Sequence, residues 1–196
     1  MTAAADTGPH RLEVVKLGGS LLTAEDLPDR LERFLRPMRD RTVLVIVGGG
    51  QLIDAVRRLD QIQSMPPSTL HWRCVDLLDV TFEFAAGRLA FLSPVQNPET
   101  ANLDGGGHHL VRVGSFYRPR VAGPLPEDWS TTTDAIAVQL AIEVLADRVT
   151  LLKSCEVQQS DAPEFLAGLS ATGVIDAATP AVAERFGGPV RVTRLP

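Results

Sequence analysis

The sequence predicts an α/β protein: a three-layer αβα sandwich in which helices cover both faces of a mainly parallel central sheet. Two observations lead to this fold class. A strand, a glycine turn and a helix follow one another twice within the first 63 residues, and such βα units build parallel sheets. The second of these strands, at 42–47, is a continuous apolar run rich in β-branched side chains. Runs of this kind are typical of strands buried on both faces of a parallel sheet.

The first half of the chain is expected to contain these two βα units and then a third, longer helix. Pro37 lies late in the first helical stretch and is expected to end or bend it, because proline lacks the backbone N–H that a helix interior needs. In order, the expected elements are a strand at 12–17, a glycine turn at 18–20, a helix at 26–39, a strand at 42–47, glycines at 48–50, a helix at 51–63 and a helix at 69–87.

The second half begins with a turn-rich segment, 89–125, which we interpret as the variable, substrate-facing part of the domain. A polar loop then leads into a clear helix, and a looser tail completes the chain. In order, we expect short strands at 89–92, 110–113 and 118–122, a helix at 135–146, a strand at 149–153, helices near 162–169 and 180–186, and a final strand at 190–194.

Length and composition indicate one domain spanning 1–196. Hydrophobic residues make up 44% and charged residues 22% of the chain, as in ordinary globular α/β proteins. The net charge of −5 argues against a nucleic-acid partner. No run approaches the roughly 20 apolar residues of a membrane span, and residues 1–11 do not resemble a signal peptide. Two distant cysteines, Cys74 and Cys155, fit a reducing compartment. We therefore expect a cytoplasmic protein.

The chain has two lysines, Lys16 and Lys153, and each ends an apolar, strand-like run. Arginine supplies the other basic residues. A lysine ammonium is a compact charge with rotatable donors, which suits a moving phosphoryl group, whereas arginine suits fixed bidentate pairing. The placement of both lysines at strand ends therefore indicates a phosphate-handling site.

Glycine turns follow the first two strands, at Gly18-Gly19-Ser20 and at Gly48-Gly49-Gly50. Glycines allow backbone N–H groups to converge on an anion, and the following helix adds the positive end of its dipole. A tight turn that binds nothing would contain the same glycines, so the first motif alone leaves both interpretations open. Neither turn is a Walker A or dinucleotide-binding sequence. Together the two turns favour a ligand site, since both end strands at the same edge of a parallel sheet.

A run of hydroxyls and carboxylates, residues 128–134, precedes the expected helix at 135–146. A Ser/Thr/Asp-rich N-cap explains part of this run. Asp134 is alternatively placed to orient Lys16 or to lie near metal-bound phosphate. Trp129 either covers the site or packs in the core.

Two further candidate groups contain histidine. His71 and Arg73, beside Trp72 in the long helix, become substrate contacts if the acceptor pocket lies along that helix. His108 and His109 lack metal-ligand spacing and are expected in a solvated loop or at the substrate. No metal site formed by protein side chains is predicted.

Four ordered pieces resemble the amino acid kinase superfamily, which includes acetylglutamate, uridylate, aspartate and isopentenyl phosphate kinases. They are Lys16-Leu17-Gly18-Gly19-Ser20, Val47-Gly48-Gly49-Gly50, Thr131-Thr132-Thr133-Asp134-Ala135 and Leu151-Leu152-Lys153-Ser154. More narrowly, the short length, His71-Trp72 and the stretch 125–134 resemble the small branch of aminomethylfuran phosphate kinases in methanofuran biosynthesis and one-carbon metabolism.

The resemblance implies an ATP- and Mg²⁺-dependent kinase for a small phosphate- or carboxylate-bearing acceptor, a phosphomonoester above all, and suggests a homodimer through the helix at 69–87. It places the acceptor side at about 12–125 and the nucleotide side at about 126–196. The implied catalytic residues are Lys16 and Asp134. The implied nucleotide contacts are Gly18, Gly19, Ser20, Thr133, Lys153 and Ser154, and the implied acceptor contacts are Gly48, Gly49, Gly50, His71 and Arg73.

The sequence also departs from this family. Relatives often follow the second lysine region with Val-Asp-Gly, whereas Cys155-Glu156-Val157 stands here, and several carry a further catalytic lysine in the carboxy-terminal segment, which has none in this chain. The competing hypothesis is therefore a weakly active or inactive nucleotide-binding or regulatory protein on a kinase scaffold.

Overall fold

The central sheet contains six strands, all parallel. The computed structural model describes residues 12–98, 106–119, 123–158 and 164–196. Within these ranges the strands are β1 (Leu12–Leu17), β2 (Thr42–Val47), β3 (Ser93–Val95), β4 (Gly107–Val111), β5 (Arg148–Lys153) and β6 (Val190–Arg194). They lie in the order β3-β4-β2-β1-β5-β6, and every pairing is parallel. The predicted parallel sheet is thereby confirmed.

The two central strands are buried on both faces. Every residue of β2 is buried, and so is every residue of β1 after Leu12. This explains the continuous apolar run of β2, because each side chain meets a helix layer on one face or the other. β1 nevertheless contains two charged residues, Glu13 and Lys16, both buried. A buried charge is costly unless it is paired. Each of these two residues therefore needs a partner of opposite charge within the fold.

The helical segments follow the predicted order closely. Nine segments are described: η1 (Gly19–Thr23), α1 (Leu27–Leu35), η2 (Arg36–Met38), α2 (Gly50–Ile62), α3 (Pro67–Arg88), α4 (Val113–Phe116), α5 (Thr133–Glu143), α6 (Phe165–Ala171) and α7 (Thr179–Phe186). Pro37 has the predicted effect, because α1 ends at Leu35 and the chain tightens into the 3₁₀ turn η2. Within the part of the chain that the structure describes, no helix has both the length and the apolar character that crossing a membrane demands.

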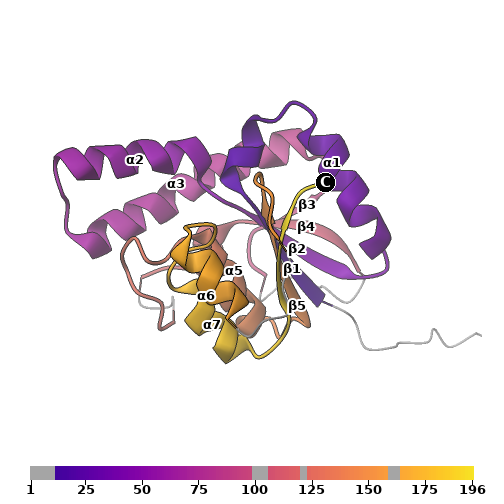
Figure 1. Ribbon diagram of the computed structural model, residues 1–196. Helices are drawn as coiled ribbons and strands as arrows, with labels where there is room; N and C mark the ends of the chain where they lie inside the picture. Colours follow the sequence, from indigo (N-terminus) through magenta and orange to yellow (C-terminus); the bar gives the residue numbers. More distant parts are fainter. Residues whose placement is uncertain (1–11, 99–105, 120–122, 159–163) are drawn as a thin grey trace, which may run out of the picture.

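The helices form the outer layers of the sandwich (Figure 1). On one face, α5 and α7 pack on the sheet together with α4, around side chains such as Ile136, Val182 and Phe116. On the other face, α1 and the carboxy-terminal half of α3 pack around Leu31 and Phe82. α2 and the first half of α3 project from the sheet as a helical hairpin (Figure 1). Residues of this hairpin line a cavity together with Lys16 of β1 and the glycines that follow β1 and β2.

The turn-rich segment differs from the prediction. Residues 89–92 form no strand, because Leu89 and Leu92 donate backbone hydrogen bonds to Ala85 and Leu89 and so close the end of α3. The strands of this segment are β3 and β4, and Val113, predicted as strand, begins α4. Part of the expected strand at 118–122 and the start of the helix at 162–169 lie outside the described residues. α5 also ends earlier than predicted, since Leu145 adopts a left-handed conformation, with φ 55°.

Candidate functional site

The two lysines lie on adjacent strands and face the same helix. β1 pairs directly with β5, and Lys16 is the register partner of Leu151, two residues before Lys153. Because side chains alternate between faces along a strand, Lys16 lies on the same face as Val14, and Lys153 on the same face as Leu151. Both apolar neighbours belong to the core beneath α5. The lysines therefore point toward the amino-terminal turn of α5.

Asp134, in that first turn, contacts both lysines. Lys16 Nζ lies 2.9 Å from Asp134 Oδ1, and Lys153 Nζ donates to Asp134 Oδ2 at 2.6 Å. Each carboxylate oxygen thus has its own ammonium partner. This geometry fits the alternative in which Asp134 orients Lys16. The sequence did not predict that Lys153 shares this carboxylate.

Electrostatics favour the ionised carboxylate in the cluster Lys16–Asp134–Lys153. Burial opposes ionisation of Asp134, which is 3% exposed, but the two ammonium groups outweigh it and hold the pKa of the carboxyl below its usual value. Burial, followed by repulsion from Lys16, lowers the pKa of Lys153, although Asp134 opposes that shift. Two cations and one anion leave one excess positive charge in a region of low dielectric constant. Such a site attracts an anion.

The two glycine turns touch one another beside this cluster. A Cβ on Gly19 would lie 2.1 Å from the nitrogen of Gly50 and 2.5 Å from the carbonyl oxygen of Gly48. Gly50 also has φ +52°, a conformation that favours glycine. The glycines therefore permit a close approach of two backbone segments. They bring the start of α2 next to the start of η1, so that backbone N–H groups of both turns gather at one edge of the sheet.

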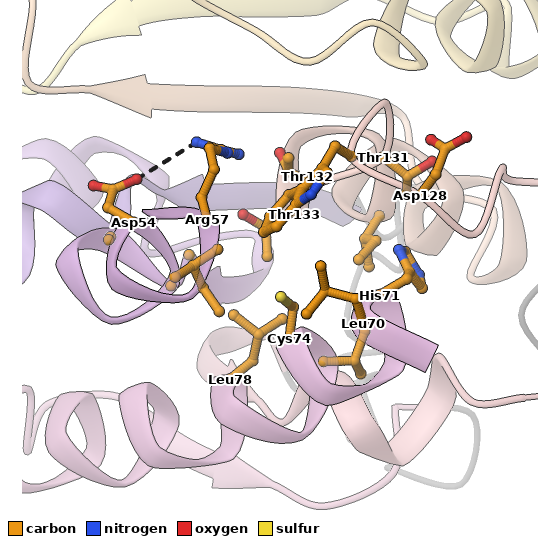
Figure 2. A pocket seen from close by; sticks show the side chains of 18 of the residues that line it. Asp54, Arg57, Leu70, His71, Cys74, Leu78, Asp128, Thr131, Thr132 and Thr133 are labelled. Carbon is orange, nitrogen blue, oxygen red and sulfur yellow. Dashed lines mark ion pairs between the residues drawn. The ribbon is translucent and has the colours of Figure 1, made fainter. Parts of the chain in front are cut away.

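A cavity lies on the α2–α3 side of the cluster (Figure 2). Its walls come from the carboxyl ends of β1 and β2, from the helical hairpin and from the loop before α5. The lining includes Lys16, Gly19, Gly48, Gly49, Gly50, Ile53, Asp54, Arg57, Leu70, His71, Cys74, Leu78, Asp128, Trp129, Thr131, Thr132, Thr133 and Ile136. Figure 2 shows the apolar residues of α3 facing the threonines across the cavity. One wall is therefore apolar and the other carries hydroxyls.

Thr131 is a candidate ligand contact that the sequence analysis missed. It is 4% exposed, it lines the cavity, and its buried Oγ1 has no hydrogen-bond partner in the described part of the protein. Buried hydroxyls are nearly always hydrogen-bonded. A polar group bound in the cavity would satisfy this one.

The rim of the cavity joins the loop before α5 to α2. Trp129 Nε1 donates to Asp60 Oδ2 at 2.8 Å, and the Arg57 guanidinium stacks over the Trp129 ring, 4.6 Å from its centroid. Arg57 also pairs with Asp54 at 3.5 Å. Trp129 therefore fastens its loop across the mouth of the cavity. Arg57 brings a second cation to the cavity besides Lys16, and nothing in the sequence distinguishes it from other helix arginines.

His71 and Arg73, grouped by the sequence analysis, lie in different surroundings. His71 is buried at the cavity, with its Nε2 3.0 Å from the Tyr117 hydroxyl, and burial lowers its pKa. Arg73 is exposed, pairs with Asp76 at 3.0 Å and borders a separate depression beside Tyr117 and Arg118. The two residues are two positions apart, and on a helix that spacing separates their directions by about 200°.

The predicted site residues divide into those that line the cavity and those that lie behind or beside it. Lys16, Gly19, Gly48, Gly49, Gly50, His71 and Thr133 line it, while Gly18, Ser20, Asp134, Lys153 and Ser154 do not. Ser20 and Ser154 are hydrogen-bonded through their hydroxyls at 3.0 Å, and the Gly18 N–H donates to the Leu152 carbonyl at 2.9 Å. These contacts join the carboxyl ends of β1 and β5. Of the predicted nucleotide contacts, Gly18, Ser20, Lys153 and Ser154 thus lie apart from the cavity, whereas Gly19 and Thr133 line it together with the predicted acceptor contacts other than Arg73.

The described residues of the segment 89–125 lie away from the cavity, in contrast to the substrate-facing place expected of this segment. None of its described residues lines the cavity; they form β3, β4, α4 and the connections between them instead. His108 and His109 lie in β4 rather than in a loop. The reason is topological: the sheet places β4 beyond β2, away from the β1–β5 pair.

The residues fit a phosphate-bound Mg²⁺ better than a metal held by the protein. Among the described residues, no cluster of three or more His, Cys, Asp or Glu side chains has the geometry to bind a metal ion. Asp134, the buried carboxylate at the site, already pairs with two lysines, whose positive charges oppose the binding of a metal ion there. Mg²⁺ commonly keeps several waters and binds through substrate phosphates, and that arrangement needs little from the protein.

Solved structures with the same architecture are kinases. A UMP kinase from Bacillus anthracis matches with a TM-score of 0.67 at 15% identity, over 96% of this chain and 88% of that chain. A uridylate kinase from Archaeoglobus fulgidus matches with a TM-score of 0.64 at 20% identity, over 93% and 90%. An aspartate kinase from Synechocystis matches with a TM-score of 0.60 at 19% identity, over 93% of this chain and 38% of that chain. No family model and no curated protein matches the sequence. The chain has the fold of these kinases.

Proposed function

We propose that the protein is an ATP-dependent phosphotransferase acting on a small phosphorylated or carboxylated metabolite. The observation that carries the proposal is the sharing of one buried carboxylate, Asp134, by Lys16 and Lys153. The cluster lies between the cavity and the joined ends of β1 and β5. Phosphoryl transfer needs positioning and charge neutralisation more than covalent chemistry from the protein, and this arrangement provides both.

In the proposed mechanism the acceptor occupies the cavity and the nucleotide phosphates lie along residues 18–20 and 153–154. Lys16, which reaches the cavity, neutralises charge on the phosphoryl group during direct in-line transfer. Lys153 neutralises the same charge from the nucleotide side, and Asp134 holds both ammonium groups in place. Mg²⁺, when bound to the nucleotide, offsets further phosphate charge. No side chain becomes phosphorylated.

The carboxy-terminal segment of this chain has no lysine, but Asp134 still has a second cation. It comes from Lys153 at the end of β5. This weakens the hypothesis of an inactive nucleotide-binding protein, for which the missing lysine was the main argument. The hypothesis remains the outcome to expect if nucleotide binds and no product forms.

For the acceptor, we propose a phosphomonoester that is converted to a diphosphate. The favoured candidate is the furan phosphate of methanofuran-type cofactor synthesis. An acceptor of this kind combines one anionic group with a compact apolar ring. In the cavity, Lys16 and the glycine N–H groups would bind the anionic group. Leu70, Cys74 and Leu78 would pack against the apolar ring. An anionic group farther along the acceptor would meet Arg57.

Turnover decides between these possibilities. Purified protein is incubated with ATP, Mg²⁺ and a panel of phosphomonoesters and carboxylates, and products are identified by ³¹P NMR. We expect a diphosphate from at least one aromatic or furan phosphomonoester, and a loss of about 10²–10³-fold in kcat for Lys16→Ala and for Lys153→Ala. Arg33→Ala, on the exposed side of α1, is the control and keeps wild-type rates. Wild-type rates in Lys16→Ala would remove this lysine from the mechanism.

We also propose a homodimer through α3. Val80 and Phe84 lie one turn apart on α3 and are 40% and 68% exposed, so an apolar strip faces outward from this helix. A second copy of the chain would cover it. Light scattering should then give twice the monomer mass for the wild type and a monomer for Phe84→Glu.

A further inference from the structure

Asp176, in the connection between α6 and α7, joins two helices to the loop that precedes Asp134. Its Oδ2 accepts hydrogen bonds from the Thr132 N–H at 2.7 Å, the Thr132 hydroxyl at 2.8 Å and the Ala135 N–H at 3.1 Å. Its Oδ1 accepts from the Thr179 N–H at 2.8 Å and the Thr179 hydroxyl at 2.6 Å. One carboxylate therefore satisfies the amino-terminal ends of both α5 and α7.

The first turn of α5 has no cap of its own. Thr132 occupies the N-cap position, but its side chain makes no capping bond to α5; the Ala135 N–H donates to Asp176 instead. The amino-terminal N–H groups of a helix need such a partner. The Ala178 N–H also donates to the Ser130 carbonyl at 2.9 Å. The segment around Asp176 is thus the external support of residues 130–135.

We propose that Asp176 is a positioning residue for the phosphoryl-transfer site. By fixing the first turn of α5, it sets the place of Asp134 and, through Asp134, the places of both lysines; it also holds Thr131 and Thr133 at the cavity wall. This inference rests on the proposed function for its kinetic consequence, although the positioning itself does not depend on turnover.

The carboxylate acts in its ionised form. Five donors point at its two oxygens, so neither oxygen has a free place for a proton. Burial and the negative charge of Asp134 raise the pKa of Asp176, and the hydrogen bonds from Thr179, Ala135 and Thr132 oppose that rise. The other groups in its field are Lys153 on β5, whose charged form Asp176 favours, and Tyr117, whose pKa is raised by burial and by nearby carboxylates. Asp176 therefore supports Lys153 electrostatically as well as through α5.

A matched set of variants tests this role. Asp176→Asn removes the charge and places amide hydrogens against N–H donors. Thr179→Val removes one hydroxyl bond to the same carboxylate on the α7 side, and Thr132→Val removes one on the α5 side. We expect kcat to fall about 10²-fold in Asp176→Asn, since misplacement of about 1 Å costs that much. A smaller loss is expected in Thr132→Val and none in Thr179→Val, although Thr179→Val lowers the Tm.

The two lysines allow a second readout that needs no turnover. Protein labelled with [¹³Cε]lysine gives one NMR signal from Lys16 and one from Lys153, assigned with Lys16→Arg. We expect the Lys153 signal to titrate at lower pH in Asp176→Asn than in the wild type, and at the wild-type pH in Thr179→Val. A purely structural role of Asp176 would lower the Tm without moving this titration.

The outcomes separate the two proposals. Absence of turnover in the wild type with every acceptor defeats the proposed function, and the lysine titration then decides the role of Asp176 alone. If Asp176→Asn does not fold, equal kcat in Thr132→Val and Thr179→Val overturns the inference, and a loss confined to Thr132→Val supports it. If Asp176→Asn folds with an unmoved Lys153 titration, or loses no more kcat than Thr179→Val, Asp176 does not position the site.

Discussion

Gly19→Ala tests whether the site depends on contact between the two glycine turns. The new Cβ would lie 2.1 Å from the backbone nitrogen of Gly50, whereas ordinary van der Waals contact begins at 3.4 Å. The two turns would have to separate by 1.3 Å (3.4 − 2.1). Neither contacting atom belongs to a flexible side chain, since the next nearest is the carbonyl oxygen of Gly48. The displacement therefore has to come from the backbone itself.

A separation of this size should affect both stability and activity. Overpacking in a close-packed region costs about 1–3 kcal/mol of unfolding free energy. Displacement of reacting groups by about 1 Å costs about 10²-fold in rate, and Gly19 and Gly50 flank the start of the cavity next to Lys16. We expect Gly19→Ala to lose stability within that range and to lose at least tenfold in kcat, in keeping with that estimate.

Urea denaturation and steady-state kinetics on the same preparations measure the two effects. Gly87→Ala is the control, because a Cβ on this α3 glycine would have no heavy atom within 4 Å; it should gain up to about 1 kcal/mol from helix propensity and keep its kcat. Gly19→Ala with the stability and kcat of Gly87→Ala would show that the two turns are not in the contact described here.

Three further predictions concern the charges and the cavity. Asp134→Asn leaves two ammonium groups without their shared counter-charge and should cost about 3–5 kcal/mol of unfolding free energy, measured by urea denaturation. The alkaline fall of kcat should begin below pH 10.5, the ordinary lysine pKa, because burial and Lys16 lower the pKa of Lys153; a pH–rate profile unchanged up to pH 10.5 would contradict this. Thr131→Val should raise the acceptor KM about tenfold, the cost of a lost hydrogen bond, and Arg73→Ala should leave it unchanged; the reverse order would place the acceptor outside the cavity.

Much of the fold was predictable because its signals are local. The apolar run of β2 and the glycines that follow β1 and β2 encode buried parallel strands and βα turns within a few residues. Pro37 ended α1 for a reason visible in one residue. The short strands β3 and β4 were harder to place, because three to five residues between turns carry little periodicity.

The residues of the candidate site could be predicted from the sequence, but the contacts between them could not. Lys16, Asp134 and Lys153 were each recognisable, but the sharing of Asp134 by both lysines requires β1 to lie beside β5, which sequence spacing does not reveal. Asp176 lies 44 residues from Thr132 and belongs to no motif. Leu78 followed core periodicity and lies in the core, as predicted, but it also lines the cavity; an apolar cavity wall and an apolar core surface have the same sequence pattern.

The most direct test of the account is whether both lysines meet the same ligand. Protein labelled with [¹³Cε]lysine is titrated with a non-hydrolysable ATP analogue and Mg²⁺, and the two lysine signals are followed. Because Asp134 holds both ammonium groups at one site, the account predicts that the signals of Lys16 and Lys153 shift together with one apparent Kd. A shift of only one signal, or of neither at saturating nucleotide, would contradict it.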